Sequence, residues 1–339
     1  MTSKPPPSWV ADGEKYALVG LSLKFEGNLP GQVTSHLSAL SGAAFGVPAH
    51  WQEWLGSIRV EEVEDCNVFL LAKLASATPG VLDGENKTLQ QRVWNFYTGL
   101  LLSSPFAPAH RPVLLTGAHE SGEIGIRKQQ DLDSPIPCLF RPYPPVTPDH
   151  IQRAAMLGEN LEALPAGKVP GGHWRLFRTL SVYIAARTTG EIIDRIHQYC
   201  RVIDGLILSE PGKGRQQFKS RPELFIGAGH HDLMGDLYDI RSAVEHLHEY
   251  RYLEKFDRAV RLDLAKKEAI AEYISRTGLA RVVGAPVLWP HFGNSQALEK
   301  FWSLPVADRQ QVWGQTVDPM AGVAQFDPKY ITDAQLGGG

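Results

Sequence analysis

A crowd of prolines near the middle of the chain constrains its fold more than any other feature. Six of the 24 prolines lie between positions 135 and 148. Proline fixes its own φ angle and has no amide donor, so such a run fits neither a helix interior nor the centre of a sheet. The stretch is therefore the best linker candidate. It separates two parts of the 339-residue chain that differ in the spacing of their apolar residues.

The part before this linker mixes strand-like and helical segments. Apolar and polar residues partly alternate over residues 16–25, which is typical of a half-buried strand. Four more stretches have strand-like apolar content: 58–63, 67–74, 112–115 and 123–127. Two segments are expected to be helical: a short turn within 48–55 and a longer helix over 89–102. We therefore expect a mixed α/β domain of no recognised type over residues 13–141.

The part after the linker has apolar residues spaced at threes and fours, which predicts helices. The expected helices are 149–164, 174–188, 191–208, 232–253 and 262–275, with a polar loop at 210–221. Shorter helical pieces are expected at 296–302 and 307–313. The pattern predicts a helical bundle over 148–290 and a C-terminal extension over 291–339. The fold class expected for the whole chain is α+β, with the mixed domain first and the bundle second.

Composition and charge limit the possible partners. The net charge of −3 excludes a strongly basic coat for nucleic acid, so any RNA contact must come from a local patch. No window approaches the ~18 apolar residues of a membrane helix, and the N-terminus lacks the apolar core of a signal peptide, so we expect a cytoplasmic protein. The three cysteines lie far apart without CxxC spacing, which favours buried thiols over disulfides or zinc. No metal or other cofactor is expected.

One predicted helix carries the most informative pattern. Its apolar stripe steps by four, three, four and three, through Leu233, Leu237, Ile240, Val244 and Leu247. Beside the stripe, Arg241 and Glu245 are spaced to form an ordinary surface ion pair. At its start, His230 and His231 suggest a metal site, but adjacent residues rarely converge on one ion, and Asp232 is better explained as the helix N-cap.

The same helix resembles the hallmark of the HEPN superfamily. The string Leu-Tyr-Asp-Ile-Arg-Ser, at 237–242, precedes His246, and the family carries Arg-x(4–6)-His on a late helix of an α-bundle. Arg241, Ser242 and His246 match the four-residue spacing, whereas His248 gives a six-residue spacing, so the choice of histidine stays open. The family often has glycine after the histidine, where this chain has Leu247. The resemblance covers roughly residues 148–290.

The resemblance implies a metal-independent endoribonuclease, of the kind found among toxins and defence effectors. Arg241 would bind the scissile phosphate, His246 would transfer a proton and Ser242 would orient either group. One arginine and one histidine are too few for the whole reaction, and similar proteins solve this by forming a homodimer with a composite site. The alternative is a catalytically inactive HEPN-like module for RNA binding or dimerisation. A purely structural helical protein is the third alternative.

The polar loop before this helix is a candidate RNA-binding segment. Four basic residues surround one aromatic residue there: Lys213, Arg215, Lys219 and Arg221 around Phe218. The cations suit phosphates, and the ring suits stacking with a base. The alternative is an ordinary solvated loop. Glycines flank Lys213, but the spacing is not that of a nucleotide-binding Walker A loop.

Overall fold

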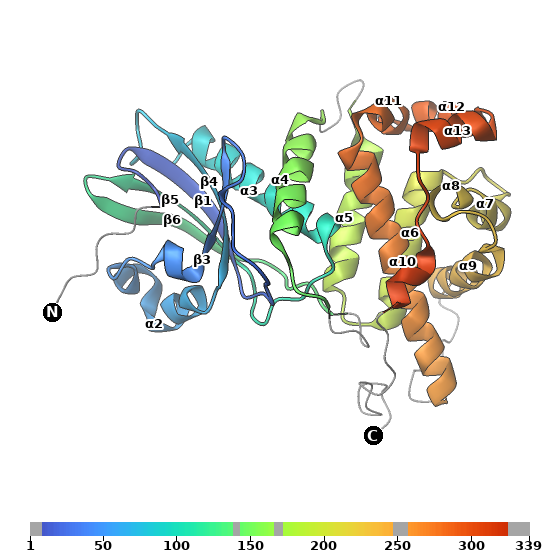
Figure 1. The fold of residues 1–339 in the computed structure, drawn as a ribbon, viewed down its shortest axis with the longest axis horizontal. Coiled ribbons are helices and arrows are strands. Elements are labelled where there is room, and N and C mark those ends of the chain that lie inside the picture. The colour runs from blue at the N-terminus through green and yellow to red at the C-terminus, as the bar shows by residue number, and fades with distance from the viewer. Residues whose placement is uncertain (1–8, 138–142, 166–171, 247–256, 325–339) are drawn as a thin grey trace. The chain divides into compact units, whose positions relative to one another are not determined.

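The chain divides into two compact units. The computed structural model describes residues 9–137, 143–165, 172–246 and 257–324 (Figure 1). The first unit, here called the sheet unit, contains Met1–Pro135 and Tyr143–Glu162. The second, here called the helical unit, contains Ile136–Pro142 and Ala163–Gly339. A six-stranded antiparallel sheet in the first unit, followed by helices in the second, confirms the predicted α+β fold class.

The sheet runs in the order β2-β3-β4-β1-β5-β6, and its neighbouring strands are antiparallel. The strands are Glu14–Leu21 (β1), Gly31–Gln32 (β2), Leu37–Ser41 (β3), Val68–Ala75 (β4), Val113–Glu120 (β5) and Glu123–Asp131 (β6). β1 lies between β4 and β5, and all its residues except Glu14 are buried. Successive side chains of a strand point to opposite faces, so burial of nearly all of them means that both faces of the sheet are covered.

Helices supply that cover (Figure 1). The helices of this unit are Gly42–Phe45 (α1), Trp51–Glu64 (α2), Gly84–Ser103 (α3) and Pro148–Ala163 (α4). α3 packs on β1, β4 and β5. Tyr16 of β1 joins a separate apolar cluster with Phe45 of α1 and Trp51 of α2. The indole Nε1 of Trp51 donates to the Ile124 carbonyl of β6 at 2.7 Å, which ties α2 to the edge of the sheet.

α4 belongs to the sheet unit, because it packs tightly against α3. A Cβ added at Gly99 of α3 would lie 2.1 Å from the carbonyl oxygen of Ala154 in α4. A Cβ at Gly158 of α4 would lie 3.0 Å from the Cα of Phe96 in α3. The two backbones approach closely only because both positions lack a side chain. The predicted bundle start at residue 148 is therefore wrong, and the long part of the helical unit begins at Ala163.

The helical unit is organised around α6, which packs against α5, α9 and α10. Its elements are Trp174–Thr188 (α5), Ile192–Ile207 (α6), Gly214–Ser220 (α7), Glu223–Ile226 (α8), His231–Glu245 (α9), Arg258–Gly284 (α10), Pro286–Leu288 (η2), Trp289–Phe292 (α11), Ser295–Ser303 (α12), Val306–Trp313 (α13) and Pro319–Val323 (η3). η3 packs on α10 and α13 on α8. The residues after 290, predicted to form a separate extension, are therefore part of this unit as far as residue 324.

A buried ionic cluster joins α5, α6 and α10. Arg195 of α6 donates to Glu268 of α10 at 2.6 Å, and both side chains are 2% exposed. One turn further along α10, Glu272 accepts from Arg276 at 2.9 Å and lies 3.6 Å from Arg187 of α5. Buried charges are tolerated only when they are paired and hydrogen-bonded, so these contacts fix how the three helices face one another.

Three local expectations differ from the structure. Residues 58–63 belong to the part of α2 that follows a kink at Gly56 (φ 75°, ψ 165°) rather than to a strand, and Val60 and Val63, three residues apart, both face the apolar cluster. The predicted polar loop at 210–221 contains α7. Asp232 is not the N-cap of α9: the helix begins at His231, after His230, and Asp232 lies in its first turn.

Candidate functional site at the seam of α6 and α9

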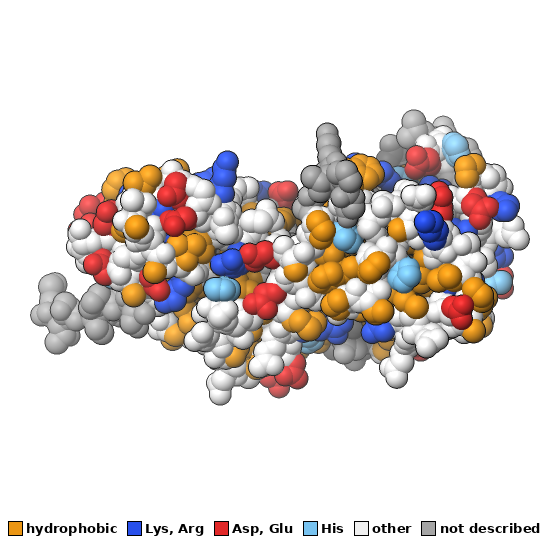
Figure 2. Space-filling view, turned by 90° about the horizontal axis from the view of Figure 1, so that it is seen from above, with side chains coloured by type: hydrophobic (Ala, Val, Ile, Leu, Met, Phe, Trp, Pro, Cys, Tyr) orange, Lys and Arg blue, Asp and Glu red, His pale blue; other side chains and the backbone are white. Residues whose placement is uncertain are grey.

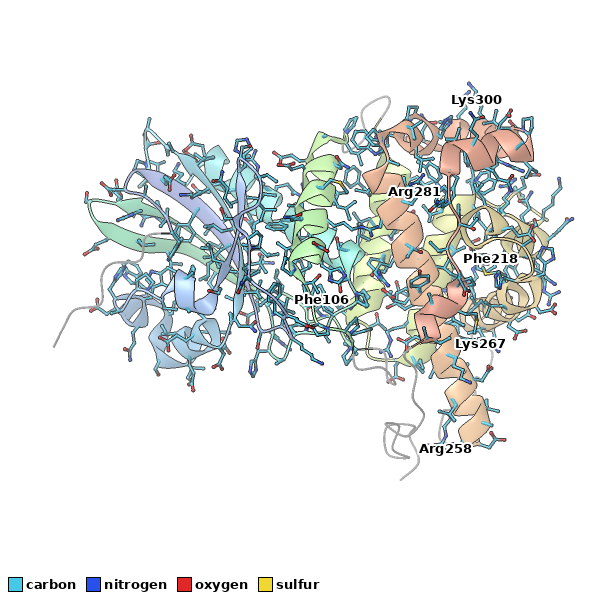
Figure 3. All side chains as sticks on the ribbon, viewed as in Figure 1. Phe106, Phe218, Arg258, Lys267, Arg281 and Lys300 are labelled. Atoms are coloured by element: carbon cyan, nitrogen blue, oxygen red, sulfur yellow. The ribbon has the colours of Figure 1, made fainter. Side chains whose placement is uncertain are left out.

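α9 is positioned by the buried side of its motif segment. Met234, Leu237 and Ile240 are buried, and the helix packs on α6 and α7. The Leu237 carbonyl accepts a weak hydrogen bond from the thiol of Cys200 in α6 at 3.5 Å. Lys267 of α10 forms an ion pair with Asp236 of α9 at 2.9 Å, which ties α9 to α10 (Figure 3). These contacts set the rotation of α9, with Arg241 and Glu245 directed toward α6.

Arg241 forms a salt bridge across the two helices. Its Nη2 lies 3.0 Å from Oδ2 of Asp204 on α6, and its guanidinium carbon lies 5.5 Å from the centre of the Tyr238 ring. The Arg241 side chain is 26% exposed, while its Nε is buried without a hydrogen-bond partner. Burial raises the pKa of Asp204, and the positive charge of Arg241 only partly opposes that rise. The guanidinium is therefore held by one carboxylate and still reaches solvent.

Glu245, the residue expected to pair with Arg241, contacts a histidine instead. Nε2 of His197 on α6 lies 2.7 Å from Oε2 of Glu245. A carboxylate can only accept, so the proton of this contact is on Nε2. The hydrogen bond from His197 holds the pKa of Glu245 below its ordinary value, and the charges of Arg241 and Arg201 lower it further. The structure thus gathers a five-residue group, here called the seam: His197, Arg201, Asp204, Arg241 and Glu245.

The other motif residues lie at the end of α9. Ser242 is half-buried and its carbonyl accepts the backbone N–H of His246 at 3.1 Å. His246 is the C-cap of the helix and its side chain is exposed. In a regular helix, His246 would be ~140° around the axis from Arg241, so helix geometry alone does not turn the two toward one another. His248 lies outside the described residues.

The predicted RNA-binding loop is folded into the unit. Phe218 is fully buried, 5.6 Å from the Tyr238 ring, so its prediction as a stacking surface is wrong (Figure 3). Arg221 donates to the Ile207 carbonyl at 2.7 Å and to Leu208, which caps the end of α6. Its role is therefore structural.

Two other basic residues of the same segment are already paired. Arg215 makes two hydrogen bonds to Asp239, at 3.0 and 2.8 Å, and Lys213 contacts Glu210 at 2.8 Å. Lys219 lies on α7 with its side-chain carbons against Gly235 of α9. Figure 2 shows one face of the molecule, on which charges of both signs are interspersed.

The sequence prediction missed the α6 side of the seam. His197, Arg201 and Asp204 are spaced by four and three residues, so they form one polar stripe on α6. That stripe is visible in the sequence, but the prediction of this helix used only its apolar residues. The partner of each polar residue could not be predicted, because it depends on how α9 is rotated against α6.

Comparisons with known proteins add no family assignment. No family model, no curated protein and no solved structure matches the chain. Within the described residues, no cluster of three or more potential ligands is placed to bind a metal ion. None of the described helices combines the length and the apolar character needed to cross a bilayer. The two described cysteines, Cys66 and Cys200, are free and buried as predicted.

Proposed function

We propose that this chain is a HEPN-like, metal-independent endoribonuclease that acts through Arg241 and His246. The observation that carries the proposal is the salt bridge between Arg241 and Asp204, which holds a partly exposed guanidinium at the surface of the helical unit. An arginine fixed in this way presents its remaining N–H groups without first losing the freedom of a mobile side chain. Phosphate oxygens are the ligands that this planar group suits best.

His246, at the C-terminal end of α9, transfers the proton on this proposal. His246 is exposed, so RNA can reach it, and histidine is the side chain most often used for general acid–base catalysis. Ser242 lies one turn earlier on α9, close enough in sequence to orient phosphate or imidazole through its hydroxyl. His248 remains the alternative residue for proton transfer. On this proposal, RNA is the substrate and no cofactor takes part.

A cleavage assay tests the assignment. Purified chain would be incubated with RNA of mixed sequence in excess EDTA, and Arg241→Ala and His246→Ala would be compared with the wild type. We expect losses of about 10²–10³-fold for the arginine variant and about 10²–10⁴-fold for the histidine variant. Arg59→Ala is the matched control, because Arg59 forms an ion pair with Glu62 in the sheet unit. Undiminished cleavage by both Arg241→Ala and His246→Ala would refute the proposed site.

The remaining histidine and the dimer need separate measurements. A loss in His248→Ala without a loss in His246→Ala would move the proton-transfer role to His248. For the homodimer, equal amounts of Arg241→Ala and His246→Ala chains would be mixed. Because two chains share a composite site on this proposal, mixing should restore part of the activity. Light scattering on the wild-type chain measures the oligomeric state directly.

Two observations favour the second candidate, an inactive RNA-binding or dimerisation module. The guanidinium of Arg241 already has a carboxylate partner, which a phosphate must displace or share. Two of the predicted RNA-binding cations, Lys213 and Arg215, also have acidic partners. RNA binding without cleavage by the wild-type chain would decide for this module. Arrest of growth when the wild-type chain, but not Arg241→Ala, is induced in cells would support a toxin or defence effector.

A further inference from the structure

The seam contains a second histidine that the motif does not include. His197 comes from α6, 49 residues before His246 in the sequence, yet it contacts the same helix through Glu245. The pair lies beside the Asp204–Arg241 salt bridge, since α6 and α9 run antiparallel there and each supplies one member of both pairs. One chain therefore places a histidine and an arginine in neighbouring pairs on the same two facing helices.

His197 is held in a way that suits proton transfer. The contact with Glu245 uses Nε2, so the carboxylate orients the ring, and a proton exchanged with a substrate would pass through the other nitrogen, Nδ1. The ring is 16% exposed, which limits its contact with water while leaving an edge accessible. A carboxylate that orients an imidazole is a recurrent arrangement for histidines that transfer protons.

We infer that His197 is a second proton-transfer residue of the ribonuclease site, oriented by Glu245. The inference rests on the proposed function. In metal-independent cleavage, the ribose 2′-oxygen loses its proton to a base and bonds to phosphorus. The bond from phosphorus to the 5′-oxygen then breaks, and that oxygen takes a proton from an acid, which leaves a 2′,3′-cyclic phosphate and a 5′-hydroxyl. This sequence needs one base and one acid. A histidine can serve as either, so His197 would supply one of the two and His246, of the same chain or of the second chain in the dimer, would supply the other.

Three variants isolate the role of His197. His197→Gln keeps a hydrogen-bonding group near Glu245, and His197→Ala removes the ring altogether. His231→Gln is the matched control, because His231 lies on α9 and contacts Glu223 at 2.8 Å, the same kind of pair at the far end of the helix. Each full-length variant would be assayed for cleavage of mixed-sequence RNA, for RNA affinity by fluorescence anisotropy and for thermal unfolding.

We expect His197→Gln to lose about 10²–10⁴-fold in the rate of cleavage while its RNA affinity and melting temperature stay close to those of the wild type. Added imidazole should restore part of the activity of His197→Ala, because a free imidazole can occupy the space and carry the proton. A merely structural histidine would not respond to imidazole. His231→Gln should cleave as the wild type does.

The outcomes separate this inference from the proposed function. Wild-type activity in His197→Gln, combined with inactivity of Arg241→Ala, overturns the role of His197 and leaves the ribonuclease standing. A loss in His197→Ala that imidazole does not relieve, with RNA affinity falling in parallel, also overturns it. If the wild-type chain cleaves no RNA, the proposed function fails and the inference fails with it.

Discussion

At the seam, burial and neighbouring groups act in opposite directions on the pKa of Asp204. Its burial disfavours the ionised carboxylate, whereas Arg241 at 3.0 Å and the hydroxyl of Ser209 at 3.4 Å favour it. The net result is a raised pKa, so burial outweighs the partners. The folded chain therefore binds a proton at Asp204 more readily than the unfolded chain does.

This imbalance predicts a dependence of stability on pH. A group whose pKa is raised by folding contributes most below its unfolded pKa, and the contribution is lost as the pH rises through the folded value. Asp204→Asn cannot titrate and lacks the effect. Urea unfolding at about pH 4 and about pH 7 should show the free energy of unfolding of the wild type falling relative to that of the variant as the pH rises. If the free energy of unfolding of the wild type, relative to that of Asp204→Asn, stayed constant or rose toward pH 7, the raised pKa would be contradicted.

At the scale of single helices, much of the structure could be predicted from sequence. α5 was predicted with its observed bounds, and α6 within one residue at each end, because their apolar residues follow helical periodicity. α7 was missed, because its only buried residue is Phe218 and the surrounding charges are typical of a loop. The pairs across the seam could not be predicted, since they depend on the packing of helices that are far apart in sequence.

The close approach of α3 and α4 predicts a sharp penalty at Gly99. Gly99→Ala places a methyl group 2.1 Å from the Ala154 carbonyl oxygen, so the helices must separate. We expect it to lower the free energy of unfolding by about 1–3 kcal/mol, as overpacking typically does. Gly84→Ala, at the start of the same helix, has no atom within 4 Å of the added Cβ and should be neutral or slightly stabilising. Equal stabilities of the two variants in urea unfolding would refute the close packing.

At the scale of the whole molecule, the change in the spacing of apolar residues along the chain predicted the α+β class. It did not predict the boundary between the units. The proline stretch suggested one linker between two contiguous domains. The chain instead reaches the helical unit at Ile136, whose N–H donates to the Arg187 carbonyl at 2.7 Å, and returns to the sheet unit at Tyr143. Prolines mark where regular structure stops, but they do not tell which unit the next helix joins.

A truncation series tests this division. A fragment of residues 1–163 includes α4, whereas a fragment of residues 1–135 leaves the α4-facing side of α3 uncovered. Exposed apolar surface and lost packing should make the shorter fragment melt at a lower temperature and associate more readily. Comparable melting temperatures and solubility of the two fragments would show that α4 adds nothing to the sheet unit.

The path of the chain also bears on how such a protein can change during evolution. Because the backbone passes between the units after residues 135, 142 and 162, neither unit is encoded by one uninterrupted stretch of the gene. A single crossover at any point leaves at least one unit incomplete: one between β6 and α4 separates α4 from its sheet, and one between Ile136 and α5 separates Ile136 from the end of that helix. The two units are thus expected to be inherited together, and a relative that carries the helical unit alone should either lack residues 136–142 or retain α4 without its sheet.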